Sequence, residues 1–217
     1  MGKFNAHVHY NADNNLAIID NLLEHEFGVN TKAEGSCLIA QAAYAIWSQT
    51  GIPIMDLVKH IDKYTPRKVD MFGHTLSEIM SAFHVPIKTS GGYVLIEAET
   101  FKYHTIEAVV DSVLDGTPII FIFPAASIEA MIGEAMQYGD GEVRDTTIRG
   151  ATEIRFHAML CIGAVKDKLP FLIMRESRHE YGYKGYLKIN GVLLQEYFHN
   201  IMVLSINVTE LEAWVTK

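Results

Sequence analysis

The chain has little of what marks several large protein classes. Only two cysteines occur in 217 residues, too few for the disulfide framework of a small secreted domain. Basic residues number 18 against 26 acidic ones, and a net charge of -8 argues against nucleic acid as the main partner, because phosphate binding needs a basic face. No apolar run approaches the ~18 residues that a membrane span needs, and residues 1–10 lack the apolar stretch of a secretory signal. These absences predict a globular, cytoplasmic protein with no nucleic-acid or membrane partner.

The hydrophobic pattern changes from helical spacing to strand spacing along the chain. Helices are expected in most of the first half, and strands with one amphipathic helix in the second half. The order predicts an α+β fold in a single domain, 1–217, with a helical lobe of about 1–92, a β-rich lobe of about 93–217 and a cleft between them. The expected helices are 14–26, 37–51, the segment after Pro53, 75–83, 106–114 and 128–138, and the expected strands are 94–96, 118–124, 158–165, 171–175, 185–189 and 201–208. The charged, glycine-punctuated loop 139–150 makes 125–153 a candidate lid or partner surface.

Cys37 stands where a short turn meets a strongly helical segment. Gly35 and Ser36 precede it, and Ser36 is a good N-cap, so Cys37 is expected in the first helical turn. Unpaired backbone N–H groups and the helix dipole favour a thiolate there. The alternative is an inert cysteine packed on a helix of small residues.

Two later segments carry further polar chemistry. His157 begins an apolar strand, a place where an imidazole can serve as a general base, although a structural, hydrogen-bonded histidine would look the same. The apolar strand 171–174 ends in the polar residues Arg175-Glu176-Ser177-Arg178, and a glycine-aromatic turn follows at 181–186. Cys161 lies within the apolar strand and is expected to pack rather than react.

Together these segments resemble the papain-like cysteine proteases. That family has Gly-Ser-Cys opening a long helix, His-Ala before apolar residues and a glycine, and an apolar strand ending in Lys-Asn-Ser-Trp before Gly-Tyr-Phe-Arg-Ile. This chain offers, in the same order, Gly35-Ser36-Cys37, His157-Ala158 leading to Gly163, Arg175-Glu176-Ser177-Arg178 and Gly185-Tyr186-Leu187-Lys188-Ile189. Weaker similarities occur at Phe72-Gly73-His74 and at Gly116-Thr117-Pro118-Ile119, so the resemblance spans roughly Val29 to Ile189.

The resemblance implies a papain-like two-lobe fold and a cysteine hydrolase that cleaves peptide or isopeptide bonds. It assigns the nucleophile to Cys37, the acid-base role to His157, and the position of the family's asparagine to Glu176. The oxyanion-hole glutamine of the family falls at Thr31, with Asn30 beside it, and Gly73 and His74 match positions that line the substrate groove. The resemblance implies a protein or peptide substrate and neither a cofactor nor a metal.

The chain also departs from the family pattern. Glu176 replaces asparagine, and no glutamine precedes Cys37. Arg178 replaces the tryptophan that shields the histidine, and it is a candidate for substrate binding. The separation of Cys37 from His157 is somewhat short, whereas that from Cys37 to Glu176 is in the family's range. These departures leave two alternatives open, a catalytically impaired binding protein and a thiol acyltransferase or amidase on the same fold. With 36 residues before Cys37, in place of the family's long pro-segment, an active form is expected to need narrow specificity or a regulatory protein partner.

The residues near the N-terminus offer a rival pattern, that of a metal site. His7 and His9 form the His-x-His pair with which metal-dependent amidohydrolases begin their first barrel strand. Such enzymes need a (β/α)8 barrel of ~250 residues, and this chain shows no eightfold alternation of strand and helix. No matching set of aspartate, glutamate and histidine follows, so the thiol chemistry is preferred.

Overall fold

The computed structural model describes residues 8–11, 16–19, 37–66, 76–100, 105–124, 130–133, 135, 142–143, 156–165, 170–176, 185–196 and 201–212. Its elements in chain order are β1 (Val8–Asn11), β2 (Leu16–Ile19), α2 (Cys37–Thr50), α3 (Ile54–Tyr64), α4 (Leu76–Phe83), β3 (Ile87–Thr89), β4 (Gly92–Thr100), α5 (Ile106–Leu114), β5 (Ile119–Pro124), β6 (Glu142–Val143), β7 (Phe156–Val165), β8 (Phe171–Arg175), β9 (Tyr186–Asn190), α7 (Gly191–Glu196) and β10 (Met202–Leu211).

Helix α2 is the central helix of the molecule. Most of its side chains are small or apolar, and nearly all of them are buried on every side. A helix that is apolar all round must lie inside the protein rather than on its surface. It ends at Gly51, whose φ of 69° lies in the left-handed region that glycine adopts without strain. Helix α3, in contrast, is amphipathic, with Ile54, Leu57 and Ile61 buried against its neighbours.

A ten-stranded sheet forms the rest of the framework. Its main path runs β3-β4-β10-β5-β7-β8-β9-β6, while β2 pairs with both β1 and β7. Strand β7 is the centre of the sheet: its first part pairs with β5, and its second part pairs with β8 and β2, all antiparallel. The interior stretch of β7 is fully buried, as expected for an apolar strand covered on both faces.

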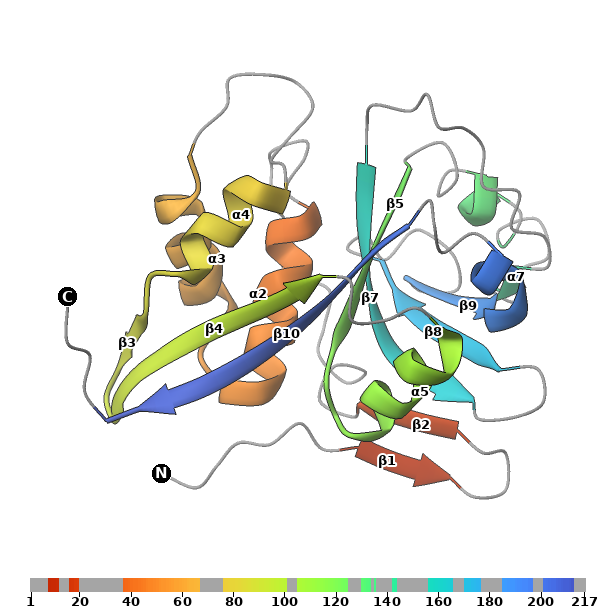
Figure 1. Ribbon diagram of the computed structural model, residues 1–217, viewed down its shortest axis with the longest axis horizontal. Coiled ribbons are helices and arrows are strands. Elements are labelled where there is room, and N and C mark those ends of the chain that lie inside the picture. Colours follow the sequence, from red (N-terminus) through yellow and green to blue (C-terminus); the bar gives the residue numbers. More distant parts are fainter. Residues whose placement is uncertain are drawn as a thin grey trace.

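Helices α2, α3 and α4 lie beside the part of the sheet that contains β5, β7, β8 and β9 (Figure 1). Figure 1 shows α2, α3 and α4 on one side, and β5, β7, β8 and β9 with α5 and α7 on the other. The long pair of β4 and β10 runs past the helices and joins the rest of the sheet through the pairing of β10 with β5 (Figure 1). Helix α2 contacts both β7 and β10, so it is packed against both parts of the sheet.

Most of the predicted elements are confirmed. The helices expected at 37–51, 75–83 and 106–114 begin and end within a residue or two of the expected positions, as do the strands expected at 118–124, 158–165, 171–175 and 185–189. Strands β4 and β10 extend beyond the expected 94–96 and 201–208. The expected helix at 128–138 is seen at 130–133 and 135, and the rest of it lies outside the described residues. The division of the chain into lobes at residue 92 stays a prediction.

Two local predictions were wrong, and the elements β1, β3 and α7 were not predicted. The segment 14–26 was expected to be helical, but Leu16–Ile19 forms β2, because its apolar residues pair with the end of β7. The loop 139–150 contains the short strand β6, which pairs in parallel with β9. Helix α7 was not predicted at all; it begins after Asn190, whose side-chain Oδ1 accepts a hydrogen bond from the N–H of Val192 at 2.9 Å.

In the described part of the chain, none of the helices combines the length and the apolar composition needed to span a membrane.

Candidate active site

Cys37 is the first residue of α2, as the sequence predicted. The side chain is partly buried, while the residues that follow it in the helix are buried. At this position the backbone N–H groups of the first turn have no partner within the helix, so they favour a negative charge nearby. Gly35 and Ser36, the expected turn and N-cap, lie outside the described residues.

His157 is the second residue of β7. The strand pairing places it opposite Phe123 of β5, which fixes the backbone at this point. Its side chain is 15% exposed, so solvent reaches the imidazole although the strand behind it is buried. An imidazole whose backbone is fixed in the sheet, and whose side chain is partly accessible to solvent, is suited to transfer a proton to a bound molecule.

Glu176 directly follows the last residue of β8 and is wholly buried. Its backbone N–H donates to the carbonyl of Gly185 at 2.8 Å, and its side-chain Oε1 lies 2.7 Å from Nε2 of His157. This distance is that of a charge-assisted hydrogen bond. The sheet therefore brings the second and third predicted site residues into direct contact.

The imidazole of His157 links the other two side chains, Glu176 and Cys37. It also hydrogen-bonds the thiol of Cys37, and since each ring nitrogen carries at most one hydrogen, the bond of Nε2 to Glu176 leaves Nδ1 for the sulfur. Glu176 thus fixes both the orientation of the ring and the nitrogen that faces the thiol. Cys37, His157 and Glu176 form one hydrogen-bonded chain.

The charges and hydrogen bonds of these three side chains favour a thiolate on Cys37 and an imidazolium on His157. Burial alone would raise the pKa of Cys37, but the hydrogen bond and positive charge of His157, with a backbone hydrogen bond from Ala158, outweigh burial and lower that pKa from its ordinary 9.0. The charge of Glu176 opposes this change. Burial also disfavours a charged imidazole, yet the hydrogen bonds to Cys37 and Glu176 and their negative charges raise the pKa of His157 to about 10. Between the two pKa values the pair is ionic.

Cys161 provides a contrast within the same protein. It is completely buried in β7 and its thiol donates to the carbonyl of Gly163 at 3.5 Å. Burial raises the pKa of Cys161 to about 12, so this thiol stays protonated at neutral pH. The prediction that Cys161 packs rather than reacts agrees with this environment.

The remaining predicted site residues are not placed. Asn30, Thr31, Gly73, His74 and Arg178 lie outside the described residues, and their expected roles stay predictions. The backbone N–H of Cys37 itself stands at the start of α2, where an oxyanion donor would be needed.

Sequence reasoning missed the residue that links the helix to the two site strands. Gln41, one helical turn after Cys37, is fully buried, and its Nε2 donates to the carbonyls of Ala158 at 3.4 Å and of Arg175 at 3.3 Å. These two residues are the direct chain neighbours of His157 and Glu176. The only signal in the sequence is one polar residue in an otherwise apolar stretch of helix.

A second missed contact supports the same strand end. The Arg175 guanidinium lies over the ring of Tyr44, with 4.1 Å from Cζ to the ring centroid. Burial lowers the pKa of Arg175, and Tyr44 and Tyr186 partly offset that effect. A buried cation–π contact of this kind ties β8 to α2 one turn beyond Gln41.

The metal alternative finds no support in the described part of the chain. His9 lies on β1, which pairs antiparallel with β2 and is not a strand of a parallel barrel; His7 lies outside the described residues. Among the described residues, no three side chains of histidine, cysteine, aspartate or glutamate are grouped so that they could hold a metal ion.

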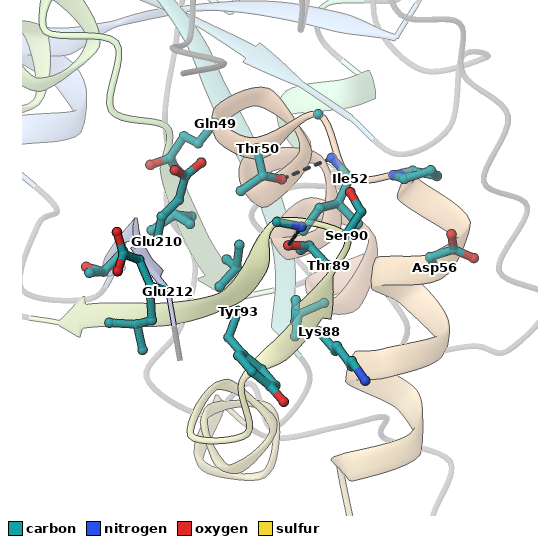
Figure 2. A pocket seen from close by; sticks show the side chains of 18 of the residues that line it. Gln49, Thr50, Ile52, Asp56, Lys88, Thr89, Ser90, Tyr93, Glu210 and Glu212 are labelled. Atoms are coloured by element: carbon teal, nitrogen blue, oxygen red, sulfur yellow. Dashed lines mark hydrogen bonds between the residues drawn. The ribbon is translucent and has the colours of Figure 1, made fainter. Parts of the chain in front are cut away.

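A separate groove lies at the other end of α2. It has a volume of about 1310 Å³, and Figure 2 shows Gln49 and Thr50 of α2, Thr89 of β3, Ser90 of the following turn, and Glu210 of β10 around it. None of the three hydrogen-bonded site residues lines it. Since α2 is about 20 Å long, this groove is remote from Cys37.

Comparison with solved structures finds proteins of similar fold. One is a cysteine protease from ragweed pollen, Amb a 11, solved in its proform, with a TM-score of 0.51, 14% sequence identity and coverage of 78% of this chain. Another is from a study of the mite allergens Blo t 1 and Der p 1, with a TM-score of 0.49, 15% identity and coverage of 80%. This chain spans 58% and 65% of the lengths of these two chains.

At this level of identity the likeness is one of fold. The ragweed structure confirms the α+β class that the sequence predicted. No family model matches the sequence, and neither does any curated protein sequence.

Proposed function

We propose that this chain, whose fold is that of the papain-like cysteine proteases, is a cysteine hydrolase that cleaves peptide or isopeptide bonds. The observation that carries the proposal is the hydrogen bond of 2.7 Å between His157 and Glu176, made by an imidazole that also bonds Cys37. A thiol, an imidazole and a carboxylate joined in this order are the groups that nucleophilic thiol catalysis requires.

The first half of the reaction is acylation. The Cys37 thiolate attacks the carbonyl carbon of the substrate amide, and the oxygen of that carbonyl takes the negative charge. His157, protonated at Nδ1, then gives its proton to the leaving amine as the C–N bond breaks. The products of this step are a free amine, a neutral imidazole and a thioester on Cys37.

The second half is deacylation by water. Neutral His157 removes a proton from a water molecule, whose oxygen attacks the thioester carbonyl. The C–S bond breaks, a carboxylic acid leaves, and the thiolate and imidazolium are restored. Glu176 stays ionised throughout and stabilises the imidazolium each time it forms, as the aspartate does in serine hydrolases.

The oxyanion is assigned two donors. One is the backbone N–H of Cys37 at the start of α2, and the other is the side-chain amide of Asn30 or the hydroxyl of Thr31. Loss of one such donor costs about 100-fold to 1,000-fold in rate, so the absent glutamine is consistent with a slow enzyme rather than an inactive one. We assign Gly73, His74 and Arg178 to substrate binding on the strength of the family resemblance.

We place this activity in the cytoplasm, with a protein or peptide substrate and a regulatory protein partner. Cys37 and Cys161 are both unpaired, which suits a reducing, cytoplasmic compartment. The substrate is a protein or peptide, and a regulatory protein partner would confine the activity.

A second candidate, a binding protein that has lost its activity, rests on the replacement of the family's asparagine by Glu176. A carboxylate accepts the same hydrogen bond from Nε2 and adds a negative charge that keeps the imidazole protonated, so the replacement by itself does not remove the chemistry. A thiol acyltransferase would share the thioester and differ only in using an amine in place of water.

The test is a search for turnover with a trapped intermediate. Fluorogenic peptide and isopeptide substrates are incubated with the chain and with Cys37→Ala, and quenched samples are analysed by intact mass spectrometry. The proposal predicts hydrolysis and an acyl adduct on Cys37, both absent from Cys37→Ala. Peptides that bind without adduct or turnover would support the binding protein. With an added primary amine present, an amide of that amine formed in place of the acid would support the acyltransferase.

A further inference from the structure

Ala158, the residue after His157, directs both of its backbone polar groups at helix α2. Its N–H hydrogen-bonds the sulfur of Cys37, and its carbonyl accepts from Nε2 of Gln41 at 3.4 Å. Cys37 and Gln41 lie four residues apart, so they stand one above the other on one face of the helix. One peptide segment of β7 is therefore held at two points by successive turns of α2.

At Ala158, the edge of β7 that faces helix α2 is not paired with another of the described strands. Strand β5 takes one side of β7, where Ile122 pairs with Ala158. Strand β8 takes the other side, but its pairing stops at Leu160 opposite Arg175. In an antiparallel strand the N–H and C=O of one residue point to the same edge, so those of Ala158 face the place that β8 has vacated. Helix α2 supplies a thiol acceptor and an amide donor there.

The same amide also fixes the third member of the site. Nε2 of Gln41 donates to the carbonyl of Arg175 at 3.3 Å, and the next residue, Glu176, donates its own N–H to Gly185 at 2.8 Å. The backbone at Glu176 is thus held on both sides. One side-chain nitrogen connects the helix that carries the thiol with the two strands that carry its partners.

The direction of the Gln41 amide follows from its surroundings. The side chain is fully buried between two carbonyl oxygens, and the opposite orientation would set Oε1 against both of them. The two hydrogens of the NH₂ group match the two carbonyls. A side chain without an N–H donor could make neither bond.

We propose that Gln41 is a positioning residue that holds Cys37 in register with His157 and Glu176. This inference rests on the proposed function, because it concerns the same three side chains. Gln41 does not touch the reacting atoms; it acts through the backbone of Ala158 and Arg175. Its loss relaxes the spacing between α2 and the ends of β7 and β8, and so weakens the hydrogen bond between thiol and imidazole.

The test compares two glutamine variants of the same helix. Gln41→Met keeps the length of the side chain but removes the donors. Gln49→Met is the matched control, since Gln49 also donates to a strand carbonyl, that of Ile206 on β10 at 2.7 Å, and lies far from Cys37. The rate of Cys37 alkylation by iodoacetamide is measured from pH 5 to 10 in both variants and in the parent chain, with melting temperatures recorded for each.

Gln41→Met is expected to move the acid limb of the alkylation profile up by about one pH unit, which lowers the rate about tenfold at pH values below that limb. Gln49→Met is expected to leave the profile unchanged even where it lowers the melting temperature. In His157→Ala, the further change Gln41→Met should have no additional effect, because the residue it positions is gone. If Gln41→Met does not fold, Gln41→Asn, which keeps the donors on a shorter arm, is compared with the parent and is expected to show the same shift.

The outcomes separate this inference from the proposed function. A parent profile that depends on His157 together with an unchanged Gln41→Met profile overturns the positioning role and leaves the proposed function standing. A parent profile that does not depend on His157 overturns both, since there would then be no pair to position.

Discussion

The carboxylate of Glu176 lies 2.7 Å from Nε2 of His157, and the Glu176 side chain is completely shielded from solvent while the imidazole is 15% exposed. A buried carboxylate is stable only where a hydrogen-bonded partner offsets its desolvation. The imidazolium of His157 is such a partner, and it is held there by β7. The pairing shows how a carboxylate can be accommodated at the position where the papain-like proteases that the sequence resembles have an asparagine.

The charge of Glu176 can be separated from its hydrogen bond. Glu176→Gln keeps an oxygen acceptor for Nε2 but removes the negative charge that raises the pKa of His157. The alkaline limb of kcat/KM, expected near pH 10 in the parent, should therefore move to lower pH, with activity at pH 7 retained within about tenfold. Glu176→Ala should lose about 100-fold because the ring is no longer oriented. An alkaline limb that stays in place in Glu176→Gln would show that the charge has no role.

The ion pair also predicts how stability depends on pH. The folded-state pKa of His157 is raised, so its contribution is complete below its ordinary pKa of 6.5 and is lost as the pH rises to about 10. The pKa of Cys37 is lowered, so its contribution is complete above 9.0 and is lost as the pH falls. Between pH 9 and 10 the unfolded-state thiol goes from about half to about nine-tenths ionised, so the remaining gain from Cys37 is small and the loss from His157 is the larger effect.

Urea unfolding at pH 9 and 10 measures this loss. The parent should lose roughly 0.5–1 kcal/mol of unfolding free energy more than Cys37→Ala/His157→Ala over that interval. The double variant serves as the control, because lysine and tyrosine titrations are common to both proteins. Equal losses in the two proteins would contradict the raised pKa of His157.

The contact between Tyr44 and Arg175 should contribute to stability. Tyr44→Leu removes the ring that lies 4.1 Å from the guanidinium and is expected to lower the free energy of unfolding by about 2 kcal/mol or more. Tyr44→Phe keeps the ring and should lose less than half as much. Similar losses in both variants, measured by urea unfolding, would assign the effect to the hydroxyl group instead.

The turn between β3 and β4 offers a matched pair of glycines. Gly92 has a φ of 139°, and a Cβ there would meet the carbonyl oxygen of Leu211 at 2.4 Å, whereas a Cβ on Gly91 would meet nothing within 4 Å. Gly92→Ala should therefore lower the unfolding free energy by about 1–3 kcal/mol, and Gly91→Ala should stay within about 0.5 kcal/mol of the parent. Thermal melts of the two variants decide this, and equal melting temperatures would contradict the arrangement of the turn.

Helices and strands whose own residues specify their secondary structure were predictable from sequence. Helix α2 was foreseen because its small and apolar residues favour a buried helix, and β7 because a long apolar run fits a covered strand. Strand β2 was not, since Leu16, Ile18 and Ile19 also fit helical spacing, and its strand form depends on pairing with β7, far along the chain. Tertiary pairing here overrides local propensity.

The site was predictable to the same extent. Cys37, His157 and Glu176 were found through their resemblance to a known order of motifs, and the structure brings them together. Gln41 was missed because its partners, Ala158 and Arg175, are 117 and 134 residues away, and no spacing rule joins a helical amide to two distant carbonyls. A residue that acts through backbone groups of other segments becomes visible only in three dimensions.

A thiolate on Cys37 paired with the imidazolium of His157 would make this thiol reactive at mildly acid pH. The rate of alkylation of Cys37 at pH 6 is measured by mass spectrometry in the parent and in His157→Ala, with buried Cys161 as the internal control. We expect rapid labelling of Cys37 in the parent, loss of about tenfold or more in His157→Ala, and no labelling of Cys161 in either. Slow labelling of Cys37 that is unaffected by His157→Ala would contradict this pairing.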